Sequence, residues 1–151
     1  MGSRSHGFPS PLLDWSQSYR VAAFFAFKEV LADNVAIYVF SERPKNIKVG
    51  SSDAPYIYGL GPNVKAHPRH FLQKSEYTMC CLFKDDQIQV TSHQDVFADA
   101  TNDQDVVWKF VIPSSERIKV LQMFDDFNLN AYSLFGTEES LLETIAMREL
   151  F

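Results

Sequence analysis

The chain has 151 residues, of which 46% are hydrophobic and 22% charged, and its formal net charge is −5 at pH 7. This balance is typical of a globular protein and excludes wholesale disorder. The acidic charge, with no Lys/Arg run longer than two residues, disfavours a broad nucleic-acid surface. No apolar stretch approaches the roughly 20 residues that a membrane span requires, so we expect a cytoplasmic protein without a membrane segment.

Aromatic residues are abundant, with 13 Phe, 6 Tyr and 2 Trp. Since aromatic side chains bury the most area per residue, they indicate a core built on Phe packing. A stacking cleft for a base or a nicotinamide ring is the alternative. The adjacent Cys80 and Cys81 lie in an apolar run, where a disulfide between strand neighbours would be strained. They therefore predict two buried, reduced thiols rather than a redox pair.

The first predicted helix is capped by Ser16 or Ser18 and runs to Leu31. Its seven successive apolar residues, 21–27, leave no polar face, so we expect this helix to be covered on more than one side. The β-branched and aromatic run that follows, 35–40, predicts a buried strand.

Residues 41–64 contain three prolines and three glycines and predict a loop with at most one short strand. Gly59 and Gly61 form only part of a phosphate-binding glycine loop. A second strong strand is predicted at 76–83, and the polar residues 84–87 predict a turn after it.

The segment 88–105 is polar and indicates a loop, whereas 106–112 predicts a third strand. Ser114 or Ser115 then caps a second helix, which ends near Asn128. That helix has an apolar stripe at three-to-four spacing, formed by Ile118, Val120, Leu121, Met123, Phe124 and Phe127.

Residues 131–135 predict a short strand that Gly136 ends. Thr137 starts a last helix, and the acidic residues of its first turn suit the helix dipole. This helix carries the apolar residues Leu141, Leu142, Ile145, Ala146 and Leu150.

These elements predict a mixed α/β fold of the α+β class, with a mainly antiparallel sheet of short strands packed against about three helices. No repeat or linker interrupts the chain, so we expect one domain over residues 6–151. Residues 1–5 have the character of an expression remnant.

A motif near the start of the chain reads His-Gly-Phe-Pro-Ser-Pro-Leu-Leu-Asp-Trp-Ser over residues 6–16, and Val-Ala-Ala-Phe-Phe-Ala over residues 21–26. This motif resembles the pattern of the FRG-domain family of bacteria and phages. Three later blocks, at 69–78, 110–116 and 130–135, come in the order that the family would have them. The resemblance implies that nearly the whole chain follows the FRG pattern.

Two departures from the family pattern bear on function. Family members usually carry a Phe-Arg-Gly strand before the His-Gly pair, so we expect a truncated, processed or short relative here. Where many members have Gln-x-Gly-x-Phe-Thr, this chain has Gln-Lys-Ser-Glu-Tyr-Thr at 73–78.

The resemblance, together with a remote likeness to ADP-ribosyltransferases, implies a site that handles a nucleotide such as NAD. The expected catalytic residues are Glu76, His6 and Asp14. The expected ligand-binding residues are Ser10, Trp15, Arg69, Gln73 and Tyr77. A carboxylate is needed because the transition state carries positive charge at the ribose carbon.

Plainer alternatives exist for the same side chains. Asp14 could act as a cap or turn acceptor at the start of the helix, His6 could bond a backbone carbonyl, and Glu76 could be a solvated residue at a strand edge. Arg69 and His70 could form a small anion grip.

Metal and hydrolase chemistry find little support. His67 and His70 are three residues apart, but Pro68 between them disrupts a regular helix, and His93 is the one obvious third ligand. The chain has no Gly-x-Ser-x-Gly nucleophile elbow. We therefore expect no metal, and NAD is the one cofactor that the resemblance suggests.

Two functions remain open. The first is an ADP-ribosyltransferase-like toxin or phage-defence enzyme that takes a small nucleotide ligand. The second is a non-catalytic module that binds a ligand or a protein. In either case a homodimer is expected, because a missing edge strand would leave sheet hydrogen-bonding groups to be covered.

Overall fold

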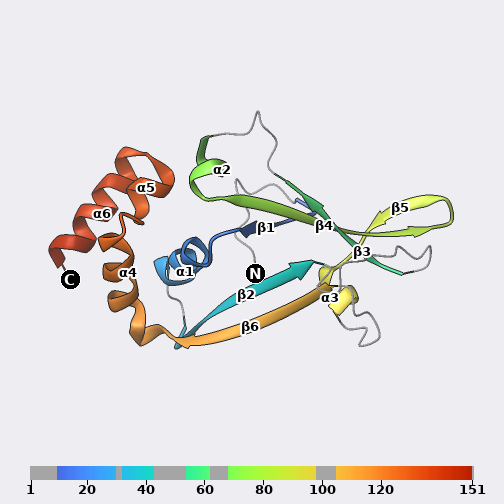
Figure 1. Ribbon diagram of the computed structural model, residues 1–151, viewed down its shortest axis with the longest axis horizontal. Coiled ribbons are helices and arrows are strands. Elements are labelled where there is room, and N and C mark those ends of the chain that lie inside the picture. Colours follow the sequence, from blue (N-terminus) through green and yellow to red (C-terminus); the bar gives the residue numbers. More distant parts are fainter. Residues whose placement is uncertain (1–9, 30–31, 43–53, 62–67, 98–104, 151) are drawn as a thin grey trace. The chain divides into compact units, whose positions relative to one another are not determined.

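The computed structural model describes residues 10–29, 32–42, 54–61, 68–97 and 105–150 (Figure 1). Contacts within the chain group it into two units. The sheet unit comprises residues 1–15, 38–61 and 76–109, and the helical unit comprises 16–37, 62–75 and 110–151. The α+β class predicted from the sequence is confirmed, whereas a single domain over 6–151 stays a prediction.

The sheet unit is built around one long strand. This strand, β4 (Ser75–Lys84), lies between β1 (Leu12–Ser16) and β3 (Tyr56–Leu60), and β5 (Gln87–Val90) also pairs with it. β4 runs antiparallel to both β3 and β5. The predicted strand at 76–83 is therefore confirmed, and the mainly antiparallel sheet is found as expected.

A tight turn joins β4 to β5. Asp85 and Asp86 both have positive φ, at 52° and 57°, the left-handed conformation that two-residue hairpin loops require. Lys84 pairs with Gln87 across this turn. The prediction of a loop over 88–105 is wrong for the start of this segment, because it contains part of β5 and the short helix α3 (His93–Phe97).

Two long strands form a separate ribbon. β2 (Asn34–Glu42) and β6 (Asp105–Pro113) pair as a two-stranded sheet, and Figure 1 shows them side by side. Each strand begins in one unit and ends in the other. Both strands were predicted from their β-branched and aromatic runs, and both predictions are confirmed.

A small apolar core lies on one face of the β4 sheet. Ile57, Cys80 and Val96 are almost fully buried there, and Phe40 and Phe97 pack against them. Cys80 and Cys81 are both buried and neither forms a disulfide, as the sequence predicted.

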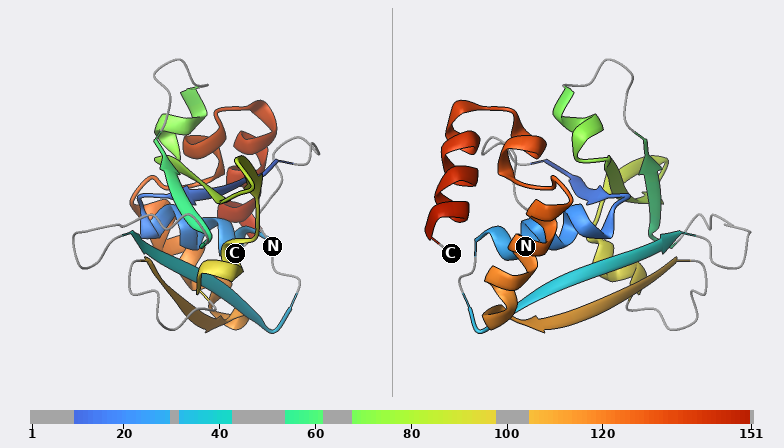
Figure 2. Two further views of the ribbon diagram at one scale, coloured as in Figure 1. Left: turned by 90° about the vertical axis from the view of Figure 1, so that its right-hand side faces the viewer. Right: turned by 60° about the vertical axis from the view of Figure 1, so that its left-hand side comes forward.

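The helical unit holds the longest helices of the described chain, α1 (Tyr19–Lys28), α4 (Arg117–Asp126) and α6 (Glu138–Leu150). These three were predicted. α1 contacts α4, and the five-residue helix α5 (Ala131–Phe135) contacts α6, as both views of Figure 2 show. α5, α3 and α2 (Pro68–Leu72) were not predicted, so the expected number of helices was too low for the described residues.

Phenylalanines dominate the core of the helical unit, as the composition predicted. Phe24 and Phe27 of α1 and Phe124 of α4 are at most 5% exposed. Val21, Leu121, Ala131 and Leu134 belong to the same buried cluster. The Ser18 hydroxyl accepts the backbone N–H of Val21 and caps α1, which confirms one of the two predicted caps.

The last helix packs with its polar side inward. Ser140 and Thr144 are each 4% exposed, whereas Leu142 is 68% and Leu150 72% exposed. The Thr144 hydroxyl donates to the Ser140 carbonyl at 2.8 Å and accepts the Tyr132 N–H at 3.0 Å. These bonds satisfy the polar groups that the packing of α6 on α5 removes from water.

The segment 131–135 is helix α5, so the predicted strand was wrong. The side chain of Asn130 accepts the backbone N–H of Ser133, and the Ser133 hydroxyl accepts the N–H of Asn130, which makes a capping box. Gly136 closes the helix with φ of 65°, the left-handed conformation that favours glycine. Two good caps thus outweigh the strand propensity of Tyr132 and Phe135.

The carboxylate of Asp125 links helices α4, α5 and α6 through hydrogen bonds. Asp125 accepts two bonds from the Arg148 guanidinium, at 2.7 and 2.8 Å. It also accepts a bond from the side-chain amide of Asn130 at 2.8 Å. The hydrogen bond from Arg148 lowers the pKa of Asp125 below its usual value.

Replacement of Asn130 by Ala should lower the free energy of unfolding by about 1–2 kcal/mol, because it removes the helix cap and the bond to Asp125. Urea unfolding followed by circular dichroism measures the change. The Asp126→Ala variant alters an exposed neighbour and should stay close to wild type. An equal loss in both variants would contradict the role assigned to the cap.

Candidate functional site

A chain of hydrogen-bonded side chains crosses three elements of the sheet unit. Thr78 on β4 lies at its centre and is 4% exposed. The Trp15 indole N–H of β1 donates to Thr78 Oγ1 at 2.8 Å. On the other side, Thr78 Oγ1 lies 2.8 Å from Nε2 of His93, the first residue of α3. The three side chains therefore fix β1, β4 and α3 to one another.

The direction of these bonds assigns the tautomer of His93. An indole nitrogen can only donate, so Thr78 accepts from Trp15. The buried Thr78 hydroxyl proton also needs an acceptor, and His93 Nε2 is in place to provide it. We therefore assign an unprotonated Nε2 and place the ring proton of His93 on Nδ1.

The burial of His93 supports this assignment. Desolvation lowers the pKa of His93 from its usual value of 6.5, which favours the neutral ring. Protonation would place an N–H at Nε2 and turn the Thr78 hydroxyl proton away from its acceptor. The hydrogen bonds that join Trp15, Thr78 and His93 therefore depend on a neutral histidine ring.

Aromatic side chains line one flank of this chain. The rings of Trp15 and Phe40 have centroids 5.2 Å apart, and those of Phe40 and Phe97 are 6.1 Å apart. Both distances lie in the range of favourable aromatic pairs. Trp15 therefore has its indole nitrogen in the polar chain and its ring in an aromatic row.

Two glycines and two carboxylates lie on the other flank. Gly59 of β3 pairs with Thr78 across the sheet. A Cβ atom at Gly59 would lie 3.4 Å from Glu42 Oε2, and one at Gly61 would lie 3.8 Å from Glu76 Oε2. Because the glycines have no side chains, both carboxylates lie next to bare backbone at this end of β3.

The alternation of side chains along the strands places the predicted site residues on two different faces of the sheet. Glu76 lies on the same face of β4 as Thr78, since side chains alternate along a strand. Tyr77 therefore points to the opposite face, and so does Asp14, the neighbour of Trp15 on β1. Ser10 is exposed and its hydroxyl accepts the N–H of Leu12 at 3.1 Å.

The structure thus brings Glu76 and Trp15 to one face of the sheet and directs Tyr77 and Asp14 to the other. His6 lies outside the described residues. The cap of α1 is Ser18, and Asp14 lies within β1.

Arg69 and Gln73 belong to the helical unit. Arg69 is half-buried in α2. The Gln73 side chain donates to the Leu134 carbonyl at 3.2 Å, and the Gln73 carbonyl accepts the Ser16 hydroxyl at 2.7 Å. Gln73 therefore connects α5 to the residues before α1. α2 begins at Pro68, because proline suits the first position of a helix. His67 lies outside the described residues, so the expectation that Pro68 prevents a regular helix through both His67 and His70 stays a prediction.

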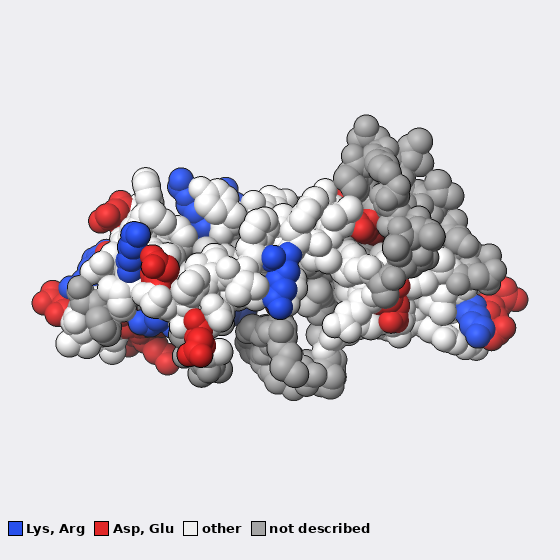
Figure 3. All heavy atoms as spheres, turned by 90° about the horizontal axis from the view of Figure 1, so that it is seen from below, with Lys and Arg blue, Asp and Glu red and all other residues white. Residues whose placement is uncertain are grey.

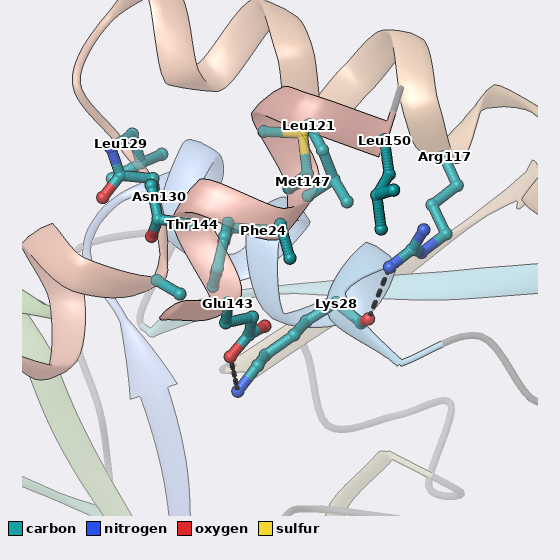
Figure 4. Close-up of a pocket in the computed structure, with 12 residues that line it drawn as sticks. Phe24, Lys28, Arg117, Leu121, Leu129, Asn130, Glu143, Thr144, Met147 and Leu150 are labelled. Atoms are coloured by element: carbon teal, nitrogen blue, oxygen red, sulfur yellow. Dashed lines mark hydrogen bonds and ion pairs between the residues drawn. The ribbon is translucent and has the colours of Figure 1, made fainter. Parts of the chain in front are cut away.

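The helical unit contains a cavity of about 200 Å³ between α6 and the helices α1 and α4 (Figure 4). Its wall is mainly apolar, including Phe24, Leu121 and Met147. Charged groups at its edge bind one another: Lys28 pairs with Glu143 at 3.2 Å. Arg117 donates to the carbonyls of Phe27 and Lys28, at 3.0 and 3.3 Å. Both cations are thus bound by other groups of the protein. The cavity is therefore a weaker candidate for a ligand site than the face with Thr78.

Several kinds of site are not found in the described part of the chain. No group of three or more His, Cys, Asp or Glu side chains there could hold a metal ion. On the surface drawn in Figure 3, Lys and Arg are interspersed with Asp and Glu. None of the described helices is both long and apolar enough to cross a membrane.

Sequence reasoning missed Thr78, Glu42 and the role of His93. One signal was present, because Ser92 precedes His93 and Asp95 follows three residues after the serine, which is a helix-start pattern. The structure bears this out: the Ser92 hydroxyl accepts the N–H of Gln94 at 3.2 Å. The position of the Glu42 carboxylate beside Gly59 has no comparable sequence signal.

The neutral His93 predicts a dependence of stability on pH. Above pH 6.5 the ring is neutral in both the folded and the unfolded chain. As the pH falls below that value the unfolded chain binds a proton first, so the free energy of unfolding should decrease until the folded ring is protonated too. Urea unfolding at a series of pH values, on wild type and His93→Gln, isolates this contribution.

The His93→Gln variant keeps an acceptor for Thr78 and has no ring to titrate, so its stability should fall less between neutral and mildly acidic pH. If His93→Gln loses stability as steeply as wild type, the neutral-ring assignment is wrong.

Comparison with known proteins bears on the N-terminal part of this site. Searches among curated proteins and among solved structures each found no match. A family model does match, over residues 3–35, and its description is the FRG domain. That range includes the Leu-Leu-Asp-Trp-Ser strand β1 and helix α1. The resemblance of this part of the chain to the FRG-domain family is thereby confirmed.

Proposed function

We propose that the sheet unit binds the nicotinamide-ribose end of an NAD-like nucleotide, and that Glu76 is the carboxylate that assists transfer of the ADP-ribosyl group. The observation that carries this proposal is the position of Glu76 next to Gly61, on the face of β4 that also presents Thr78. A toxin or phage-defence role in a bacterium or phage, as the FRG resemblance suggests, is part of the same proposal.

The glycines make this face suitable for a ligand. A ligand could contact the backbone at Gly59 of β3 and at Gly61 just after it, where a side chain would otherwise stand, and reach Glu42 and Glu76. Carboxylates accept hydrogen bonds from ribose hydroxyls in many dinucleotide sites. Two carboxylates would also favour the positively charged nicotinamide ring.

The proposed transfer of the ADP-ribosyl group requires a negative charge beside ribose C1′. The bond between ribose C1′ and the nicotinamide nitrogen breaks, and its electron pair leaves with nicotinamide. An acceptor oxygen or nitrogen forms the new bond to C1′ and releases its proton to solvent. Positive charge develops at C1′ in between, and a carboxylate beside it lowers the barrier.

The neighbouring side chains have supporting roles in this proposal. Trp15 would flank the nicotinamide ring, and the Thr78–His93 pair would hold Trp15 and α3 in place. His6 stays a predicted catalytic residue, and Ser10, Arg69 and Gln73 stay predicted ligand-binding residues. Asp14 and Tyr77 receive no role at C1′, because their side chains point to the other face of the sheet.

Nicotinamide release from NAD tests the enzymatic function. The full chain should release nicotinamide, and Glu76→Gln should lower the rate by about 10²–10³-fold, because it removes the charge that stabilises the transition state. Glu139→Gln changes an exposed carboxylate of α6 and should leave the rate unchanged. The proposal fails if wild type releases no nicotinamide above background.

A non-catalytic binding module is the second candidate. It is favoured by one observation, namely that Trp15, Thr78 and His93 use their polar groups on one another. These hydrogen bonds hold the three side chains in fixed positions. They leave no nucleophile paired with a base among the three residues. The site would then recognise a ligand or a protein and leave it unchanged.

Thermal unfolding with ligands separates the two functions. In the binding-module case, ADP-ribose or NAD should raise the Tm of wild type and Glu76→Gln by similar amounts with no nicotinamide released. In the enzyme case, NAD should be consumed by wild type alone. If neither nucleotide shifts the Tm, the nucleotide is excluded and a protein ligand is left.

A further inference from the structure

The cavity of about 200 Å³ in the helical unit has a mainly apolar wall. Phe24 and Leu121 are 5% and 6% exposed, and Met147 is half-buried. The two buried polar residues of the wall, Asn130 and Thr144, direct their side-chain groups to hydrogen-bond partners in the protein. A molecule inside the cavity therefore meets apolar groups and few polar ones.

Such a wall is poorly suited to water. No buried side-chain nitrogen or oxygen of the described residues lacks a hydrogen-bond partner, whereas a water molecule in a cavity needs about two to four polar partners. An apolar group that displaces water from this space loses no hydrogen bond and gains contacts with the wall. The interior of the cavity thus favours the apolar part of a ligand.

The edge of the cavity carries more positive than negative charge. Lys28, Arg117 and Glu143 line it, so two cations meet one carboxylate, and Figure 4 shows the three side chains together. Glu143 pairs with Lys28 at 3.2 Å. Arg117 donates instead to the uncharged carbonyls of Phe27 and Lys28. No carboxylate of the described chain pairs with Arg117, so its charge is not neutralised there.

Arg117 retains donors for a ligand after it has capped helix α1. The bonds to the two carbonyls come from Nε and Nη2, and a guanidinium has further N–H groups on Nη1 and Nη2. Those two nitrogens can bind both oxygens of one carboxylate in parallel. Arg117 is half-buried, and such a bond is stronger there than in bulk water. The charge at this edge is therefore complementary to an anionic group.

We propose that the cavity binds a small monocarboxylic acid, with its apolar body against Phe24, Leu121 and Met147 and its carboxylate on Arg117. The volume sets the size of that body. A cavity of about 150 Å³ holds benzene, so one of about 200 Å³ should hold about eight carbon atoms. Every residue of the wall belongs to the helical unit, so this site shares no residue with the proposed nucleotide site.

Isothermal titration calorimetry of the full chain tests the two parts of the ligand. Octanoate should bind one-to-one with a Kd on the order of 0.1 mM. Octanol has the same apolar body without the charge and should bind about tenfold more weakly, and acetate has the charge without the body and should not bind. Absence of octanoate binding overturns the proposal, and so does octanol binding of equal strength.

NMR of methyl-labelled methionines locates the ligand without any change to the protein. Octanoate should shift the methyl signal of Met147, which lines the cavity. The signal of Met79, which lies on β4 in the sheet unit, should stay in place. Binding that leaves Met147 unshifted overturns the proposal.

The Arg117→Gln variant tests the carboxylate contact. It should weaken octanoate binding by about tenfold and leave octanol binding unchanged, because glutamine keeps an N–H donor for the end of α1 but has no charge. Lys119→Gln is the matched control on α4, since its side chain is 84% exposed, and it should bind octanoate as wild type does. Equal octanoate affinity in Arg117→Gln and wild type overturns the proposal. If Arg117→Gln does not fold, the octanoate and octanol affinities of wild type decide.

Discussion

The alternation of side chains along β4 is the constraint on which the rest of the sheet unit depends. Thr78 faces Trp15 and His93, and its hydrogen bonds fix which side of the strand is polar. Glu76 and Cys80 must then share the face of Thr78, and Tyr77 and Met79 must share the other. One strand thus separates the face that carries the Trp15–Thr78–His93 hydrogen bonds and the small buried core from the face that carries Tyr77 and Met79.

The sequence predicted those elements whose local signals agree with one another. The β-branched runs of β2 and β6 and the capped, apolar helix α1 were recognised because propensity and pattern indicate the same structure. Residues 131–135 were mistaken for a strand because Tyr, Leu and Phe favour strands, while the decisive caps, Asn130 and Gly136, lie just outside the segment. Helix α6 was recognised by Thr137 and the acidic residues of its first turn, but its polar buried side could not be inferred from its leucines.

The candidate site was harder to predict than the fold, because it depends on pairing between distant segments. Glu76 and Trp15 were chosen from the motif, and the structure brings them to one face of the sheet. Thr78 and His93 were not chosen, since a hydrogen bond across 15 residues leaves no periodic signal. The separation of Asp14 from Glu76 follows from the strand conformation of residues 12–16, which was not predicted.

The left-handed turn at Asp85 and Asp86 has a consequence for how this protein can diverge. A two-residue hairpin loop pins the pairing of Lys84 with Gln87. Insertion or deletion of a single residue there would exchange the two sides of β5, so Ile88 and Val90 would trade places with Gln87 and Gln89. The length of this turn is therefore far more restricted than its composition, and relatives that keep the hairpin should vary the two aspartates before they vary their number.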